Sequence, residues 1–462
     1  MRDILVSLIL IAMMPTCFRK PFVGLLVFSL LAYMRLQDLT WGWARTIRWS
    51  FYVAVITFSG FFASSRERRF SVSDLRITVM GLMVFLVAVS IVKNRGLDPK
   101  DVTGFLEYLK IIVIAMFTTG MLKNRERLRM MVWTITLSFC FFGFKSGFVG
   151  VLTLGRMEII QGPGGMLVDN NDFALALAMA VPMMVMVGIS ERQEILRRTL
   201  LACVPLTALT IFMTHSRGGA LSLMVGTLVM VLRSKNRVAG IALLCLGLVG
   251  GAILAPSGIK DRLSSISEYD ADSSAQARFA AWRTAAVMIE QNPIFGVGFA
   301  HFQDNYHKYD PANTDRSLNK TKGFVAHNSY LQIWAECGTP TLLLYLSLIL
   351  LSLMDLWAVR AMAVRRYYSS WIINYATMFE ASLLTFTFGS IFLNRAQFDL
   401  FYHWVAIILS FGLIARQHMT DPAFLPVDSV GRGVLRPVSQ GGFKGRRLAS
   451  GFDRRSVQDG SF

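Results

Sequence analysis

Long apolar runs separated by short polar or basic stretches recur along most of the 462 residues. Many of these runs are close to the roughly 17–25 residues that an α-helix needs to cross a bilayer. Alternation of apolar and polar positions in segments of about ten residues, which would mark a transmembrane β-barrel, is absent. The pattern therefore predicts an all-α polytopic membrane protein.

The N-terminal unit, residues 3–34, contains two apolar pieces that the stretch PTCFRKP separates. Each piece is short for a full crossing, so we count the unit as one broken span. We then expect about twelve transmembrane helices, or about thirteen if the unit counts as two. The other predicted spans are residues 49–63, 77–92, 103–121, 130–150, 173–189, 199–213, 219–232, 238–255, 328–356, 371–393 and 399–415.

Basic loops indicate how the spans thread the membrane, because cytoplasmic loops of membrane proteins carry an excess of Lys and Arg. If all of these loops lie in the cytoplasm, consecutive spans cross the membrane in pairs. Both termini then lie in the cytoplasm, and the loop that joins the two spans of a pair lies outside. The basic stretches are SSRERRF (64–70), LKNRERLR (122–129), ERQEILRR (191–198), RSKNR (233–237), RAMAVRRYY (360–368) and the tail after Arg416.

This threading divides the chain into four parts. Membrane helices occupy residues 1–255 and 328–416, and an outer loop lobe lies between them at 256–327. The lobe contains SAQARFAAWRTAAVMIEQNP, whose apolar positions Ala277, Trp282 and Met288 have helical spacing. They predict an amphipathic helix near the membrane surface. The basic tail, 417–462, is rich in Gly, Ser and Arg, and its composition predicts a disordered cytoplasmic segment.

Composition supports the membrane interpretation. Hydrophobic residues make up 54% of the chain and charged residues only 16%, whereas soluble proteins are about a quarter charged. The net charge of +18 would suggest nucleic acid in a soluble protein, but the cytoplasmic loops explain it here, so we expect no nucleic-acid partner. The five cysteines lie in or beside apolar runs and suit small core positions. No His/Cys spacing resembles a zinc site.

On the expected outer side, where the charge rule predicts few basic residues, four arginines are candidates for function. They are Arg217 in the turn THSRGG, Arg278 and Arg283 on the lobe helix, and Arg395 in the short turn LNRAQFD. Charges near a bilayer are costly unless paired or hydrated, which favours a functional role; snorkelling to the interface is the alternative. Guanidinium groups bind phosphates in a bidentate manner, so the matching ligand is an outer-leaflet phosphate or pyrophosphate.

Polar clusters on the same side have both plain and functional interpretations. GPGGMLVDNNDFALA (162–176) places Asp169, Asn170, Asn171 and Asp172 before a helix, which is typical of a turn and N-cap. The cluster also suits a hydrogen-bonding rim for a sugar, or a cation site of oxygen ligands. The Asp-x-Asp of EYDADS (268–273) is a weak metal signal, and NPIFGVGFAHF (292–302) predicts a tight bend at Gly296 and Gly298.

His327 stands at the outer start of the 328–356 span, followed by Asn328 and Tyr330. A neutral imidazole there can take a proton from an attacking hydroxyl; a helix cap or interface residue is the plain alternative. His215 and His403 also lie near the outer membrane edge. With Asp169, Asn170 and Asn171, we place His215, Asn328 and Tyr330 on a candidate glycan or acceptor rim.

Taken in order, these motifs resemble the O-antigen ligase and polymerase superfamily of bacterial envelope glycosyltransferases. The resemblance rests on THSRGG, then ARFAAWRTAAVMIEQNPIFGVGF, then VAHNSYLQIWAECGTPTLLLYL, and covers roughly residues 210–345. GPGGMLVDNNDFALAL and FLNRAQFDLFYHW are most similar to the ligase-like branch associated with exosortase gene clusters.

The resemblance implies a metal-independent, cofactor-free glycosyltransferase of the helical GT-C-like membrane type, in the bacterial inner membrane with its site facing the periplasm. The donor would be a glycan on undecaprenyl pyrophosphate, and the acceptor a sugar hydroxyl of the lipid A–core. His327 would be the general base, and Arg217 and Arg278 would hold the pyrophosphate. Arg283 and Arg395 join them only by position. Glu336 matches the acid that follows the family's histidine and is interpreted as a structural partner in the span.

Other functions remain open. A polymerase of the same superfamily uses the same donor, and so does a protein O-oligosaccharide ligase. A flippase or transporter would also explain many spans and an arginine-lined site, although it would usually contain internal repeats.

Asp169, Asp172 and Asp399 have no evident pairing that would make one a nucleophile, so we expect inversion at the anomeric carbon.

Overall fold

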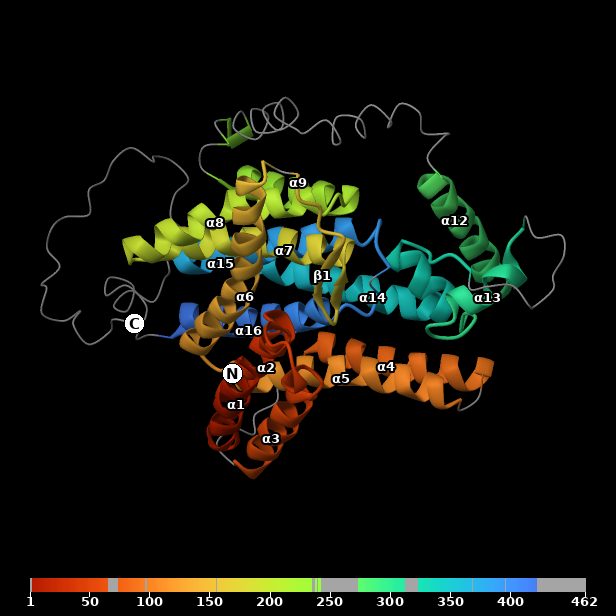
Figure 1. Cartoon of the computed structure of the whole chain (residues 1–462), viewed down its shortest axis with the longest axis horizontal. Coiled ribbons are helices and arrows are strands. Elements are labelled where there is room, and N and C mark those ends of the chain that lie inside the picture. Colours follow the sequence, from red (N-terminus) through yellow and green to blue (C-terminus); the bar gives the residue numbers. More distant parts are fainter. Residues whose placement is uncertain are drawn as a thin grey trace, which may run out of the picture.

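The computed structural model describes residues 2–64, 74–95, 98–154, 156–234, 237–238, 240–241, 273–311, 323–367, 369–394 and 396–421. Most of these residues are helical (Figure 1). The helices are α1 (Arg2–Arg19), α2 (Pro21–Tyr33), α3 (Trp49–Ala63), α4 (Leu75–Arg95), α5 (Pro99–Met121), α6 (Arg125–Leu152), α7 (Asn170–Ser190), α8 (Glu194–Met213), α9 (Arg217–Arg233), α12 (Ser273–Gln291), α13 (Phe302–Tyr309), α14 (Ser329–Met362), α15 (Ser370–Gly389) and α16 (Asp399–Thr420).

The helical expectation is confirmed over most predicted spans. Among the described residues, α4, α5, α6, α7, α8, α14 and α16 are the seven helices long and apolar enough to cross a membrane. Helices α2 and α3 are apolar but shorter, and the N-terminal unit divides into α1 and α2 at Lys20. The total of about twelve spans stays a prediction, because most of the expected span 238–255 lies outside the described residues.

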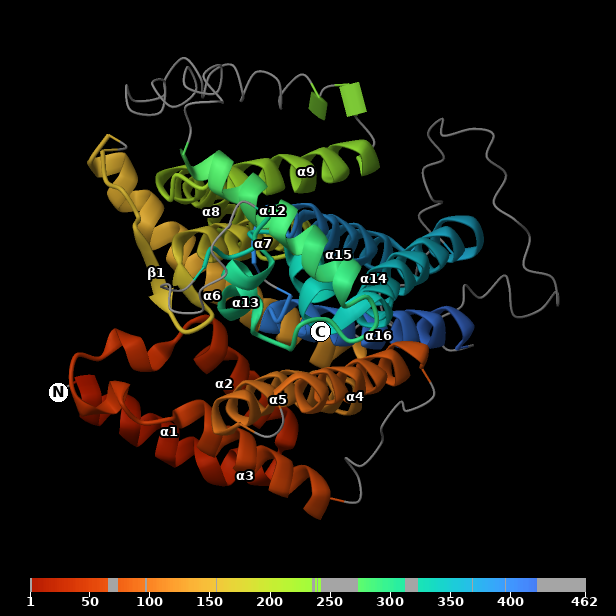
Figure 2. The ribbon, with the colours of Figure 1, turned by 90° about the vertical axis from the view of Figure 1, so that its right-hand side faces the viewer.

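The bundle is layered, as Figures 1 and 2 show. Helices α8 and α9 lie on one side, α7, α14, α15 and α16 in the middle, and α1 to α5 on the other side. In the apolar stretches of α16 and α7, 83% and 78% of the residues are buried. At this centre the ring of Phe379 packs against the rings of Trp404 and Phe411, with centroids 5.1 Å and 5.2 Å away. A small second core between α12, α13 and the start of α14 contains Met288, Phe302 and Ala326.

A short hairpin interrupts the helical pattern where the Gly-rich turn was expected. Strands β1 (Gln161–Gly164) and β2 (Leu167–Asp169) pair antiparallel. Its tip contacts the N-terminal unit: a Cβ on Gly165 would lie 1.9 Å from Arg35, which pairs with Asp38 of the 3₁₀-helix η1 (Leu36–Leu39). Gly165 has a φ of +56°, so both its backbone and its surroundings require glycine.

The described parts of five expected cytoplasmic loops meet at one end of the bundle, which we call the basic end. Arg129 lies 2.9 Å from Glu191, Arg125 lies over the ring of Trp371, and Trp371 contacts His418. These contacts join loops from four different places in the chain. Further contacts here are Arg233–Glu380, Trp357–Glu380, Arg360–Thr377 and Arg416–Asp355.

Helix α14 is broken at Gly338, whose φ of 81° and ψ of 175° are not helical. The break and the missing N–H of Pro340 leave backbone groups without partners inside the helix. The loop 292–298, with sequence NPIFGVG, satisfies them by three backbone hydrogen bonds. These run from Val297 N to Ala335 O at 2.9 Å, from Gly298 N to Glu336 O at 3.1 Å, and from Thr339 N to Pro293 O at 2.7 Å.

This loop–helix interlock depends on glycine on both sides. A Cβ on Gly338 would lie 2.1 Å from the carbonyl oxygen of Ile294, and a Cβ on Gly296 would lie 2.3 Å from the carbonyl carbon of Glu336. Gly296 also has a φ of +65°. The expected bend at Gly296 and Gly298 is therefore confirmed, and its reason is the close approach of two backbones.

We predict that Gly338→Ala destabilises the protein, because the new Cβ meets Ile294 and the backbone conformation is nearly specific to glycine. In nanodiscs its melting temperature should fall by roughly 5 °C or more. Gly104→Ala is the matched control, since a Cβ at Gly104 in α5 meets nothing within 4 Å. Equal melting of the two variants would contradict the interlock.

Candidate functional site

Four segments expected on the outer side meet at the end opposite the basic end. We call this place the rim end and define it by residues 169–172, 214–219, 323–330 and 390–394. The side-chain amide of Asn170 donates to the carbonyl of Thr214 at 2.9 Å. A Cβ on Gly218 would contact Phe392 at 3.1 Å. Segments distant in sequence therefore surround one region.

The start of α14 is anchored on the 390–394 segment. The N–H of Ser329 donates to the carbonyl of Ser390 at 2.8 Å, and its hydroxyl donates to the carbonyl of Leu393 at 2.7 Å. Asn328 is the N-cap, and its Oδ1 accepts from the N–H groups of Tyr330 and Leu331. These bonds fix the backbone immediately after His327.

His327 has a left-handed backbone, with a φ of +47°. This conformation is uncommon for a residue with a Cβ and costs of order 1–2 kcal/mol, so neighbouring contacts must hold it. On its other side, the indole N–H of Trp282 in α12 donates to the carbonyl of Ala326 at 2.8 Å. The ring is partly buried. A strained, anchored histidine is the arrangement expected of a functional residue.

Burial lowers the pKa of His327, and the positive charge of Arg278 lowers it further, while Asp169 acts in the opposite direction. The net effect is a pKa below the ordinary value, which keeps the imidazole neutral and able to accept a proton near neutral pH. The influence of Asp169 on His327 was not foreseen from sequence, because the two are separated by more than 150 positions and no spacing rule connects them.

The arginines are distributed unequally. Arg278, on the first turns of α12, is close enough to His327 to act on its charge. Arg217 begins α9 in the segment that Asn170 and Phe392 contact. Arg283 is exposed and lies roughly 140° around α12 from Arg278. Arg395 lies outside the described residues.

The other predicted rim residues have structural partners. Asp169 is the N-cap of α7 and accepts from the N–H of Asn171 at 2.8 Å, which confirms the plain interpretation of that cluster. The hydroxyl of Tyr330 donates to the carbonyl of Thr387 at 2.7 Å. His215, with a φ of +54°, has its Nε2 3.4 Å from a carboxylate oxygen of Glu158. A role of these residues on a ligand rim stays a prediction.

Metal ligation receives no support from the described part of the chain. There, no three His, Cys, Asp or Glu side chains are placed to hold a metal ion. The Asp-x-Asp of residues 270–272 lies outside that part. Metal independence therefore stays a prediction, which chelation tests below.

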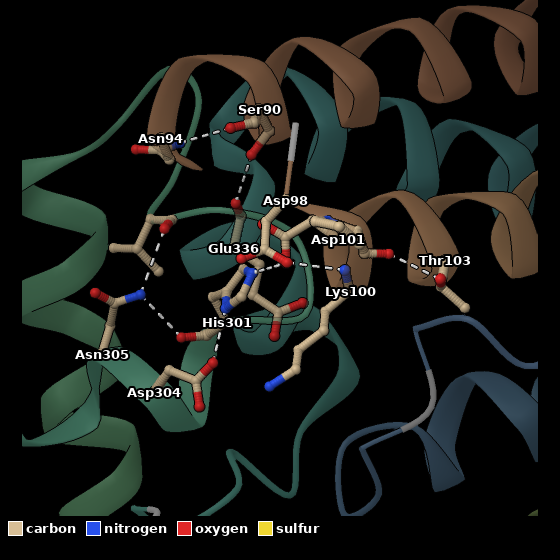
Figure 3. Close-up of polar contacts among 12 residues, drawn as sticks. Ser90, Asn94, Asp98, Lys100, Asp101, Thr103, His301, Asp304, Asn305 and Glu336 are labelled. Atoms are coloured by element: carbon tan, nitrogen blue, oxygen red, sulfur yellow. Dashed lines mark hydrogen bonds and ion pairs between the residues drawn. The ribbon is translucent and has the colours of Figure 1, made fainter. Parts of the chain in front are cut away.

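Polar contacts of Glu336 and Ser90 stabilise the interlock (Figure 3). The Ser90 hydroxyl of α4 lies 3.0 Å from the carbonyl oxygen of Glu336 and 2.7 Å from that of Phe295. The Glu336 carboxylate accepts from the N–H of Phe302 at 3.2 Å. These contacts support the interpretation of Glu336 as a structural partner in the span.

A second contact ties the lobe to α5 (Figure 3). His301 has Nε2 2.5 Å from Asp101 of α5 and Nδ1 2.8 Å from Asp304 of α13. Sequence reasoning placed His301 only in a polar loop. The bridge spans 200 positions of sequence, so no local pattern predicts it.

We predict opposite shifts of the His327 pKa in two variants. Arg278→Gln removes a positive charge and should raise it, whereas Asp169→Asn removes a negative charge, keeps the N-cap and should lower it further. Diethylpyrocarbonate modifies neutral imidazole, so the pH midpoint of His327 labelling, read by peptide mass spectrometry, should move up in the first variant and down in the second. Arg198→Gln, at the basic end, is the control. Shifts in the same direction would refute this electrostatic arrangement.

Comparison with known protein families gives two matches. Residues 201–346 match the family described as O-Antigen ligase, and residues 1–188 match a family of unknown function (DUF5935). The first match contains Arg217, Arg278, His327 and the whole interlock. No curated protein matches the chain. The resemblance to the O-antigen ligase superfamily is thereby confirmed, and the assignment to its ligase-like branch stays a prediction.

Proposed function

We propose, from the match of residues 201–346 to the O-antigen ligase family, that the protein is an O-antigen ligase. It transfers a glycan from undecaprenyl pyrophosphate to a sugar hydroxyl of the lipid A–core, with inversion and without a metal or other cofactor. It lies in the bacterial inner membrane, with the rim end in the periplasm and the basic end in the cytoplasm. Members of the matched family are ligases and polymerases, which supports an enzyme.

One observation carries the proposal. His327 is held in a left-handed conformation at the rim end, with Arg278 close enough to lower its pKa. A neutral base beside a fixed positive charge suits a reaction in which a hydroxyl loses a proton while an anionic leaving group departs. The position of the basic loops at the opposite end supports the periplasmic orientation.

The proposed reaction needs no nucleotide, because the anomeric carbon already carries a good leaving group. The acceptor oxygen forms a bond to that carbon while the bond from the carbon to the phosphate oxygen breaks. The hydroxyl proton moves to His327, and the electron pair leaves with undecaprenyl pyrophosphate. Attack on the face opposite the leaving group inverts the anomeric centre.

The arginines stabilise the charge that develops on the pyrophosphate. Arg278 has the strongest support, since it acts on His327 itself. Arg217 is placed on the adjacent segment of the rim end. Arg283 faces another direction on α12, and we assign it to approach of the anionic donor instead of contact with the transition state. Arg395 belongs to the proposal by its sequence position alone.

The direct test uses purified protein in nanodiscs, lipid-linked glycan and lipid A–core, with product analysed by mass spectrometry. Transfer to the lipid A–core without nucleotide, unchanged by a chelator, is the expected result. Growth of the lipid-linked chain instead would indicate a polymerase, and transfer only to protein hydroxyls a protein ligase. Movement of lipid-linked glycan across the bilayer without transfer would indicate a transporter. Loss of activity on chelation, restored by a divalent ion, would contradict metal independence.

We predict that His327→Ala lowers kcat by roughly 100-fold or more, the usual contribution of a general base. Arg278→Gln should lower kcat by about 10-fold or more, because it removes a charge that is most important as the leaving group departs. Arg198→Ala, whose side chain is 76% exposed at the basic end, is the control. Normal turnover by folded His327→Ala would remove the base assignment.

A further inference from the structure

A cavity of about 240 Å³ lies beside the rim end, between the lobe and the start of α14. It begins at Val325, two residues before His327, and follows α14 past Gln332 to Glu336. Its remaining walls come from the lobe and from the turn before α16. The lining residues there are Ala300, Phe302, Gln303, Asn394 and Gln397.

Half of the residues that line the cavity are amides, and two of these have a buried oxygen without a hydrogen-bond partner. These oxygens are Oε1 of Gln332 and Oδ1 of Asn394. Gln332 is only 8% exposed, and its amide nitrogen makes only long contacts of 3.4 Å with the Glu336 carboxylate. A buried polar atom without a partner destabilises the folded protein. Both residues line the same cavity, and a ligand bound there would supply the missing donors.

The backbone around these groups is fixed. Leu393, next to Asn394, accepts the Ser329 hydroxyl. The Gln303 side chain donates to the carbonyl of Gly323 at 3.1 Å, which orients its amide. Glu336 is held by the N–H of Phe302. The polar atoms are therefore preorganised, as in a binding site, and are not flexible surface groups.

We propose that this cavity binds one monosaccharide ring of a substrate glycan and thereby positions a neighbouring part of that glycan at His327. The proposal rests on the proposed function and adds to it a sugar subsite. Sugar hydroxyls both donate and accept, so they match amide oxygens and nitrogens together with one carboxylate. The apolar walls at Phe302 and Val325 suit the C–H faces of the ring.

The size and charge of the cavity restrict its occupant. Its volume equals roughly eight water molecules at about 30 Å³ each and is below the roughly 300–1,000 Å³ of sites for drug-sized ligands. It therefore holds one ring and not a longer oligosaccharide. A divalent cation is a poor match, since Glu336 is the single carboxylate among its lining residues. An acyl chain would leave the amides without partners.

The ring belongs either to the donor glycan or to the acceptor sugar, and labelling of Asn394→Cys by a maleimide distinguishes them. The probes are lipid-linked glycan and lipid A–core, each extracted from the producing bacterium, and undecaprenyl pyrophosphate without sugar. One glycan should slow the labelling at least threefold, and the sugar-free lipid should not. The substrate that protects identifies the source of the ring. Arg198→Cys, at the basic end, should label at an unchanged rate with every probe.

The native cysteines that the structure describes are buried, and peptide mass spectrometry identifies the labelled position. The same nanodiscs are assayed for transfer with the wild-type protein. Unchanged labelling with both glycans, while transfer proceeds, would overturn the sugar subsite and leave the proposed function intact. Protection by a glycan without any transfer would keep the subsite and remove the ligase assignment. Equal protection by the sugar-free lipid would overturn the subsite.

Gln332→Met provides a second test that does not depend on a weakened fold. It removes the amide oxygen that lacks a partner, together with the two long contacts to Glu336, and keeps an unbranched side chain of similar size. The melting temperature should therefore change little. The KM for the substrate that protects Asn394→Cys should rise about tenfold, with kcat changed less than threefold. A lower melting temperature with an unchanged KM would indicate a purely structural amide and contradict the proposal.

Discussion

The backbone interlock between the loop 292–298 and the broken helix α14 is the contact on which the site depends. Gly338 and Pro340 interrupt the helix, and the backbone carbonyls of Ala335 and Glu336 that this leaves free accept hydrogen bonds from the loop. Since buried peptide groups must find hydrogen-bond partners, the loop 292–298 and the broken part of α14 are ordered together. The lobe is thereby held against the same helix that His327 immediately precedes.

Charge is separated along the bundle in a way that serves this site. Loops rich in Lys and Arg meet at the basic end, where Glu191 and Glu380 pair with some of them. At the rim end, Arg278 and Asp169 act on His327 with opposite signs. Positive charge beside a neutral base favours an anionic ligand over a zwitterionic lipid, as the proposed function requires.

Sequence reasoning identified the elements better than their contacts. The helical spans, the lobe helix ending before Pro293 and the N-cap at Asp169 follow from periodicity and local propensity, and the structure contains them. The hairpin β1–β2 was missed, because a Gly-rich turn has no strand periodicity of its own. The break in α14 was also missed: the pair Gly338 and Pro340 was visible, but an apolar run was interpreted as one span.

The candidate site was predicted partly from position and partly from resemblance. His327 and Arg278 were named from the sequence, and the structure brings them together. The cavity behind His327 was not foreseen, since Gln332, Glu336 and Asn394 come from separate segments whose approach depends on tertiary packing. The spacing of single amides within apolar runs does not predict which of them line the same cavity.

A structure of the protein in nanodiscs with lipid-linked glycan bound tests the central claim most directly. The account predicts that the pyrophosphate lies within hydrogen-bond distance of the Arg278 guanidinium, about 2.7–3.2 Å. The anomeric carbon should then face His327. A pyrophosphate at the basic end, or one held on the Arg283 side of α12 with His327 remote from the sugar, would contradict it.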